Sequence, residues 1–543
     1  MQATMQLFPL SIGHILRHGS RVHGGAQVST FTGTDIRRAS FGEVAARTGR
    51  LAAALHRLGV RHGDCVGTFG WNHQEHLEAY YAVPCMGAVL HTLNIRLFTD
   101  QLTYVINHGG DKVVIVDGPL IPLLARVAAD LTTVEQYVVV GEGDLSLLPG
   151  ALRYEELLAA EGEGYGWPEL EETSAAALCY TTGTTGDPKG VVYSHRSVFL
   201  HALSECSGAA FGLGGADRIL LINPLFHAMG WGLPYAAWLV GADIVFPGPY
   251  AQPEGLSRLV ALTRPTFAAA VPTVWTDLLR YSEDHTVDLS SLRMIASGGS
   301  AVPPALMERF EDRHGVRIVQ AWGMTETSPL AAISFPPPGT APDQQMAWRA
   351  KTGRPLHGVE LRLCDDDGRL LPWDGTATGE IEARGPWVTG SYHGVDAGEK
   401  FHDGWLRTGD VGTIDALGFV QITDRAKDVI KTGGEWISSV ELENSLMAHP
   451  AVLEAAVVGV VDDRWGERPL ACVVLREPTA AGPRELCDFL SSRVARWWLP
   501  ERWAFLDAIP KTSVGKFDKK ALRARYSAGN LPVEVLPDRA QAR

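Results

Sequence analysis

Apolar residues follow two alternating spacings along the first part of the chain. From Phe41 to Leu58 they recur every three or four positions, as on one face of a helix, and Gly59 ends this pattern. Residues 65–69 form a short run of residues that favour β-structure, which is typical of a strand. The same alternation then predicts a helix over 73–86, a strand over 88–93, a helix over 100–107 and a strand over 113–116. This order indicates stacked βα units around a mostly parallel sheet.

The pattern changes twice further along. A second alternation of helix and strand spans about 197–332, and the proline-rich residues 333–345 predict a surface loop. Residues 354–422 show short strands separated by Asp-Gly and Gly-Pro turns, which predicts a β-rich subdomain.

A charged break at 424–428 precedes a segment with its own helix over 439–447 and strand over 455–461. We therefore predict an α/β protein with a large N-terminal domain, residues 1–424, and a small α+β C-terminal domain, residues 425–543. A chain of 543 residues agrees with more than one domain, since single cores stop growing near about 250–300 residues.

Composition excludes several classes of protein. The net charge of −14 gives no support for nucleic-acid binding. The seven cysteines are widely spaced without a CxxC pair, which disfavours a disulfide framework and a zinc site and fits a reducing cytoplasm. No apolar run approaches the roughly 18 residues of a membrane span, so we expect any membrane contact to be peripheral.

One loop carries the clearest chemistry. The sequence YTTGTTGDPKG at 180–190 follows an apolar stretch and is rich in the glycines, hydroxyls and cation that surround phosphate oxygens. Its candidate phosphate ligands are Thr181, Thr182, Gly183, Thr184, Thr185, Gly186 and Lys189. An ordinary turn is the alternative.

The loop is not a P-loop of the GxxxxGK[ST] type. Pro188 stands where the second glycine would be, and Gly190 replaces the Ser or Thr after Lys189. The residues that follow, 191–194, are strand-like, so we expect a turn between two strands.

Four more segments complete a family resemblance. QAWGMTETSP (320–329), WLRTGDVG (405–412), DRAKDVIKTGGEWIS (424–438) and PKTSVGKFDKKALR (510–523) occur with the loop in the order of the adenylate-forming enzymes. The chain resembles this superfamily over nearly its whole length, and NPLFHAMGWGLPYAA (223–237) resembles bacterial fatty acyl-CoA synthetases. The resemblance implies two-step thioester synthesis from an acid, ATP and CoA, with Mg²⁺ as cofactor and a mobile C-terminal domain.

The resemblance also assigns the groups nearest the reaction. Lys516 matches the mobile lysine that bridges the acid carboxylate and the α-phosphate. Glu326 matches the magnesium-binding glutamate, with Thr181 completing the metal site. The alternatives are a solvated lysine among Lys511, Lys519 and Lys520, and a glutamate that caps a helix.

The nucleotide pocket is inferred in the same way. Trp322 would stack on adenine, and Asp410 would accept hydrogen bonds from two ribose hydroxyls. The full candidate set is Gly299, Gln320, Ala321, Trp322, Thr325, Asp410, Arg425, Lys427 and Lys431. A core tryptophan, a common turn and a solvated charge run are the alternatives. Gly433 and Gly434 could line a pantetheine tunnel once the small domain rotates near Asp424, or could form a plain turn.

The candidate acyl pocket consists of His227, Ala228, Trp231 and Gly298. His227 stands where amino-acid-activating relatives carry an aspartate, so we predict an acid without an α-amino group. Small residues beside Trp231 favour a medium- or long-chain fatty acid, each buried CH₂ contributing about 0.8 kcal/mol. An aryl or short-chain acid, an acceptor other than CoA, and a non-catalytic nucleotide- or lipid-binding protein stay open. The family also leads us to expect a homodimer.

Overall fold

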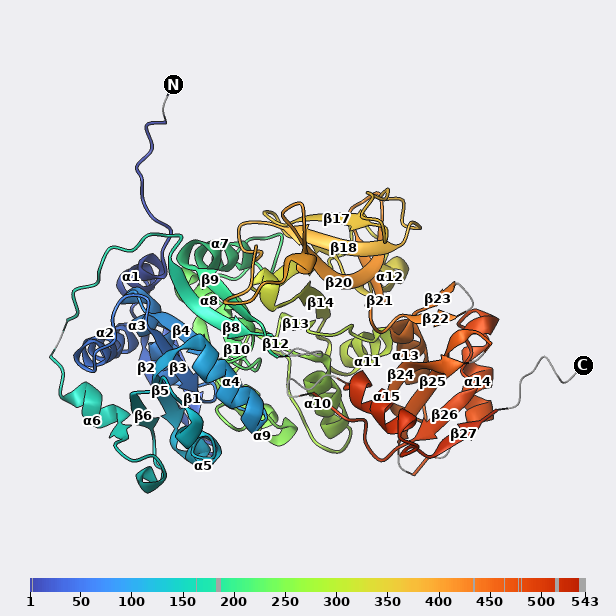
Figure 1. The fold of residues 1–543 in the computed structure, drawn as a ribbon, viewed down its shortest axis with the longest axis horizontal. Coiled ribbons are helices and arrows are strands. Elements are labelled where there is room, and N and C mark those ends of the chain that lie inside the picture. The colour runs from blue at the N-terminus through green and yellow to red at the C-terminus, as the bar shows by residue number, and fades with distance from the viewer. Residues whose placement is uncertain are drawn as a thin grey trace, which may run out of the picture.

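The computed structural model describes residues 1, 3–162, 164–181, 187–432, 435–462, 464–476, 478–479, 481–512 and 517–536. Their strands form sheets of nine, seven, five and six strands, and the six-stranded sheet lies at the C-terminal end of the elongated molecule (Figure 1). This mixed α/β architecture is the predicted fold class. No helix in the described ranges is both long enough and apolar enough to cross a bilayer.

The seven-stranded sheet is the predicted, mostly parallel one. Its order is β7 (Leu152–Arg153), β6 (Gln136–Val140), β5 (Asp111–Asp117), β3 (Cys65–Phe69), β4 (Val89–Thr92), β8 (Ala175–Tyr180) and β9 (Gly190–Ser194). All neighbours are parallel except β8 and β9, which pair antiparallel with Tyr180 opposite Gly190. The glycine- and threonine-rich loop therefore joins two strands, as its sequence predicts.

The nine-stranded sheet has a parallel centre and antiparallel edges. Its order is β16 (Arg354–Pro355), β15 (Leu330–Ile333), β14 (Ile318–Gly323), β13 (Met294–Gly298), β12 (Phe267–Ala270), β10 (Arg218–Leu221), β11 (Asp243–Phe246), β1 (Gln27–Phe31) and β2 (Ile36–Ser40). Strands β14 to β1 run parallel, while β15, β16 and β2 are antiparallel to their neighbours. The carboxyl ends of the central strands thus meet at one edge.

A layer of helices separates these two sheets. Because strand side chains alternate between faces, Ile115 of β5 and Ile219 of β10 join one shared core, while Val114 and Leu220 face outer cores. The shared core contains residues of α1 (Ile12–Val22), α2 (Phe41–Arg57), α3 (Gln74–Cys85), α7 (His195–Glu205) and α8 (Leu233–Val240). The outer helices are α4 (Thr99–Gly109) and α5 (Ile121–Leu124) on one side, and α9 (Pro253–Thr263), α10 (Pro272–Asp284) and α11 (Pro304–His314) on the other.

Helix α2 shows how the sequence sets an element. Ser40 and Glu43 form a capping box, in which the Glu43 N–H donates to Ser40 Oγ and the Ser40 N–H donates to Glu43 Oε2 at 2.7 Å. The first helical residue, Phe41, stacks on Trp238 of α8 with ring centroids 4.0 Å apart. Gly59, with φ of +94°, follows the helix where a left-handed residue is required.

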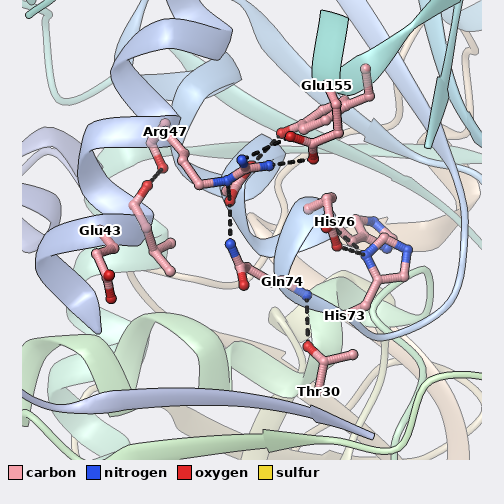
Figure 2. A network of polar contacts seen from close by, with 12 residues as sticks. Thr30, Glu43, Arg47, His73, Gln74, His76 and Glu155 are labelled. Carbon is pink, nitrogen blue, oxygen red and sulfur yellow. Dashed lines mark hydrogen bonds and ion pairs between the residues drawn. The ribbon is translucent and has the colours of Figure 1, made fainter. Parts of the chain in front are cut away.

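Polar side chains tie the start of α3 to both sheets (Figure 2). The Gln74 N–H donates to Thr30 Oγ1 of β1 at 3.2 Å, and Arg47 of α2 pairs with Glu155 of α6 (Tyr154–Ala159) at 2.7 Å. His73 Nε2 lies 2.8 Å from Asp117 Oδ1 at the end of β5. Although burial lowers the pKa of His73, the neighbouring carboxylates of Asp117 and Glu75 raise it to about 10, so this histidine is a buried cation.

The remaining sheets follow in sequence order. The β-rich region predicted over 354–422 adds β17 (Glu360–Cys364), β18 (Gly379–Arg384), β19 (Phe401–His402), β20 (Trp405–Ile414) and β21 (Val420–Arg425), after α12 (Gln345–Arg349). The six-stranded sheet contains β22 (Ile430–Thr432), β23 (Glu435–Ile437), β24 (Val452–Asp462), β25 (Gly466–Leu475), β26 (Arg502–Phe505) and β27 (Val533–Val535). Its helices are α13 (Ser439–Met447), α14 (Pro483–Leu490) and α15 (Lys519–Ser527).

The chain passes from one sheet to the other between Arg425 and Ile430. The two cores of the six-stranded sheet draw only on residues between 430 and 536, separate from the cores of the preceding sheets. The C-terminal segment therefore has its own hydrophobic interior.

Candidate functional site

A cavity of about 1130 Å³ lies where the nine-stranded sheet, the five-stranded sheet and the C-terminal segment meet. Its walls include Gly298 at the end of β13, Asp410 of β20 and Glu443 of α13. The predicted site residues on its surface are Thr181, Lys189, His227, Ala228, Trp231, Gly298, Gly299, Gln320, Ala321, Trp322, Thr325, Glu326, Asp410, Arg425 and Lys427. Segments that are far apart in the sequence therefore line the same cavity.

Several predicted residues are not placed at this cavity. Lys431 is exposed on β22 and is not part of the lining. Thr182, Gly183, Thr184, Thr185 and Gly186 of the loop, Gly433 and Gly434, and Lys516 lie outside the described residues. The roles of all of these residues stay predictions.

The two ends of the phosphate-binding candidate loop are held together. Thr181 N–H donates to Lys189 O at 2.9 Å, and Lys189 N–H donates to Thr181 Oγ1 at 3.2 Å. Lys189 Nζ lies 5.1 Å from the centre of the Tyr392 ring and 3.7 Å from Glu399 Oε1. The lysine charge is therefore directed toward the wall of the cavity that contains Glu326 and Tyr392.

Asp410 binds two other candidate residues. Trp322 Nε1 donates to Asp410 Oδ2 at 2.8 Å, and Arg425 Nε lies 2.6 Å from Asp410 Oδ1. The carboxylate is 4% exposed, whereas the Arg425 side chain is 42% exposed. These contacts fix the indole edge and the carboxylate, and each carboxylate oxygen keeps a second lone pair for a ligand.

Backbone packing shapes the floor between β13 and β14. A Cβ atom on Gly298 would lie 2.5 Å from Ala321 O, so only glycine fits between these strands. Gln320 Oε1 accepts from Val302 N–H at 2.7 Å, and Gln320 Nε2 donates to Lys351 O at 3.0 Å. Both ends of this amide bind backbone, so Gln320 positions the loop over the cavity floor.

Glu326 is held by a tyrosine that sequence analysis did not single out. The residue is 8% exposed in a single 3₁₀ turn, Thr325–Thr327, and its Oε1 accepts from the Tyr392 hydroxyl at 2.7 Å. Tyr193 likewise donates to Thr325 O at 2.6 Å. A single sequence offers no spacing that would link these tyrosines to residues more than 60 positions away.

The predicted acyl segment is a run of left-handed residues. Over Ala228–Gly232 the values of φ are 38°, 43°, 60°, 61° and 79°, and three of these five residues carry side chains. Such conformations cost about 1–2 kcal/mol for each residue other than glycine. The strained turn places Ala228 and Trp231 on the cavity wall, with Trp231 only 8% exposed.

A cluster of buried polar side chains, Asp424, Glu443 and Lys519, lines the cavity near the segment where the chain crosses from the five-stranded to the six-stranded sheet. Asp424 Oδ2 accepts from Ser439 N–H at 2.7 Å at the start of α13, and Lys519 Nζ lies 2.8 Å from Glu443 Oε1. Burial lowers the pKa of Lys519, but Glu443 and Asp424 together raise it above its ordinary value. Lys519 is therefore a largely buried member of an ion pair and not a solvated lysine, and the role of Lys516 stays a prediction. Lys427 also faces the cavity, and burial lowers its pKa.

Two family profiles match separate parts of the chain. A family profile described as AMP-binding enzyme matches residues 17–393, and one described as AMP-binding enzyme C-terminal domain matches residues 441–516.

Full-length relatives share a large fraction of the sequence. The chain is 41% identical to a medium-chain-fatty-acid CoA ligase of Ectopseudomonas oleovorans, over 97% of this chain and 98% of that protein. It is 44% identical to a long-chain-fatty-acid CoA ligase of Thermus thermophilus, over 96% and 97% of the two chains. The crystal structure of anthranilate CoA ligase AuaEII in complex with anthranoyl-AMP is similar with a TM-score of 0.88 and 28% identity, covering 97% of this chain and 99% of that one.

Proposed function

Since this chain belongs to the family of AMP-binding enzymes, we propose that it is an ATP-dependent ligase that joins medium- or long-chain fatty acids to CoA. The observation that carries the proposal is the single cavity lined by Thr181, Lys189, Glu326 and Asp410 next to the Ala228–Gly232 turn. One wall thus offers groups for a nucleotide and the adjoining wall offers space for an acid.

In the proposed first step, an oxygen of the fatty carboxylate attacks the α-phosphorus of ATP. A new P–O bond forms, the bond to the β-phosphate oxygen breaks, and pyrophosphate leaves with the electron pair. Asp410 would accept the ribose hydroxyls, Trp322 would cover the adenine, and Lys189 would neutralise phosphate charge. By resemblance, Lys516 would lie between the carboxylate and the α-phosphate, where negative charge accumulates.

In the proposed second step, the sulfur of CoA attacks the acyl carbon and AMP leaves. This step needs access to a carbon that Lys516 guards in the first step. The passage between Arg425 and Ile430 is where the C-terminal segment could turn to exchange one face for another. We accordingly place the domain limit at residues 424 and 425, and a homodimer and a cytoplasmic location stay predictions.

The residues present fit a magnesium ion. Glu326 offers a buried carboxyl group whose Oε1 accepts from the Tyr392 hydroxyl, and Thr181 offers a hydroxyl on the same cavity. Hard oxygen ligands beside phosphate are what Mg²⁺ prefers. When bound, the ion would neutralise phosphate charge. The one Cys, His and Glu group among the described residues, Cys364, Glu382 and His402, is occupied by Arg362, whose Nη2 lies 2.6 Å from Glu382.

The substrate class is tested by measuring acyl-CoA, AMP and pyrophosphate with straight-chain acids of increasing length and with an aryl acid such as anthranilate. We expect kcat/KM to rise with each added CH₂ until the cavity is filled. A preference for the aryl acid, equal rates at all lengths, or adenylate without thioester would contradict the fatty-acid proposal.

The division of labour is tested with Lys516→Ala. Loss of this cation should slow pyrophosphate release by about 10²–10³ and spare thioester formation from supplied acyl-AMP and CoA. Lys511→Ala is the matched control from the same lysine run, because Lys511 is exposed and is not itself part of the cavity lining, although its partner Glu454, 2.6 Å away, is. Equal loss of both half-reactions in Lys516→Ala would refute the assignment.

A further inference from the structure

An acidic side chain lines the acyl side of the cavity. Glu205, the last residue of α7, is 0% exposed to solvent and yet belongs to the cavity lining together with Phe211, Trp231 and Leu330. His201 lies one helical turn earlier and is 1% exposed. An otherwise apolar part of the cavity therefore contains a buried carboxyl group with a buried imidazole beside it.

Each of the two groups has at least one polar atom to which the described residues offer no hydrogen bond. His201 Nε2 accepts from Leu330 N–H at 3.0 Å, so in the neutral ring the proton sits on Nδ1. Nδ1 lies 3.9 Å from Glu205 Oε2, which is beyond hydrogen-bond distance. Within the described residues, His201 Nδ1 and both carboxyl oxygens of Glu205 have no hydrogen-bond partner.

Burial decides the charge of both groups. It lowers the pKa of His201 to about 3 and raises the pKa of Glu205 well above its ordinary value. An unpaired charge is costly in an apolar space, so burial favours the uncharged imidazole and the uncharged carboxylic acid. Together they present two donors, the Nδ1–H and the carboxyl O–H, and one acceptor, the carboxyl C=O.

The fold holds the pair in place. A Cβ atom on Gly232 would lie 2.4 Å from His201 Nδ1 and 3.0 Å from Glu205 Oε2, so the backbone of the strained turn packs directly against both groups. Because unpaired buried polar groups are costly, a purely hydrocarbon ligand beside them would leave that cost in place.

We propose that this enzyme activates fatty acids carrying a hydroxyl group on the tail, and that Glu205 and His201 bind this hydroxyl. A hydroxyl has one O–H donor and two lone pairs, which complement the one acceptor and two donors of the pair. An ammonium group would oppose both donors, and a carboxylate would oppose the acceptor and bring an unbalanced charge into an apolar space. The inference deepens the proposed function and rests on it.

The test compares kcat/KM for terminal hydroxy acids with kcat/KM for unsubstituted acids of the same length, over a series of lengths. For at least one length the hydroxy acid should be favoured by about tenfold or more, since a site built to hydrogen-bond a hydroxyl rejects the analogue that lacks it. Glu205→Leu should abolish this ratio and raise activity toward the unsubstituted acid. Glu205→Gln keeps one donor and one acceptor and should retain most of the preference.

Leu203→Ala is the matched control on the same helix, because Leu203 is 51% exposed and faces away from the cavity lining. If no acid at all yields acyl-CoA, the proposed function fails. If unsubstituted acids yield acyl-CoA at least as well as hydroxy acids at every length, and Glu205→Leu leaves the ratio unchanged, this inference alone is overturned. A buried water would then be the partner of the pair.

Discussion

At the scale of single residues, the site depends on polar groups that position one another. Asp410 illustrates this, because its two oxygens contact the Trp322 indole N–H and the Arg425 guanidinium before any ligand is considered. The family resemblance predicted these three residues as one site and placed Thr181, Lys189 and Glu326 beside them. It could not predict Tyr392 or Glu205, because their importance comes from contacts across the fold that leave no local pattern.

We expect Asp410→Asn to raise the KM for ATP by about tenfold or more. The substitution removes the charge that holds Arg425. It also places an amide N–H against either the Trp322 indole N–H or the Arg425 guanidinium, both of which are donors. Steady-state kinetics at saturating acid and CoA measure the change. Asp367→Asn is the control, since Asp367 is exposed and pairs with the exposed Arg369. An unchanged KM for ATP in Asp410→Asn would contradict the nucleotide assignment.

At the scale of elements, periodicity predicted the strand at 65–69 and the helix at 439–447 with the bounds that the structure has. The strand-like residues at 191–194 also predicted a turn between two strands at the phosphate-binding candidate loop, and the structure shows that these strands are antiparallel. Periodicity could not reveal that α1, α2, α3, α7 and α8 lie between two sheets, because a helix pattern does not state which sheet each face contacts. Nor does any composition rule predict the left-handed run at 228–232, where Ala, Met and Trp adopt a conformation typical of glycine.

The left-handed run yields a pair of opposite predictions. Ala228→Gly should stabilise the protein by roughly 0.5–1 kcal/mol, because the strain removed exceeds the added entropy of the unfolded chain. Gly230→Ala should destabilise it, since φ is +60° and a Cβ atom would lie 2.8 Å from Leu225 Cδ2. Apparent melting temperatures of both variants measure these changes. A shift in the same direction for both would contradict the strain argument.

The start of α3 gives a pH dependence. The pKa of His73 is raised from 6.5 to about 10 by Asp117 and Glu75 against the effect of burial, so the folded state holds this proton more tightly than the unfolded chain. The stabilisation is complete below pH 6.5 and is lost as the pH rises to about 10. We expect His73→Gln, which cannot titrate, to flatten the decline of melting temperature across that window. His56→Gln, at an exposed histidine, should leave the decline as steep as in the unaltered chain.

At the scale of the whole molecule, the cavity walls come from parts with separate cores. The residues of the cores beyond residue 430 do not overlap with those of the two large sheets. Scanning calorimetry should therefore resolve two transitions. Lys519→Ala leaves Glu443 and Asp424 buried without their cation and should lower the C-terminal transition by the equivalent of about 3 kcal/mol while sparing the other.

Lys511→Ala, which opens only a partly exposed pair, is the control for this measurement. One transition that shifts as a whole in Lys519→Ala would show that the two parts do not unfold independently. The result would then also argue against a C-terminal segment that moves by itself.

The shared cavity has a consequence for cooperativity. A molecule that contacts both Asp410 and the surface of α13 and α15 acts as a tether between two bodies that are otherwise joined by a short crossing of the chain. Its binding energy is then linked to the unfolding of both bodies at once. Saturation with a tight adenylate analogue should merge two melting events into one, so that the ligand, as much as the polypeptide, makes the protein a single thermodynamic unit.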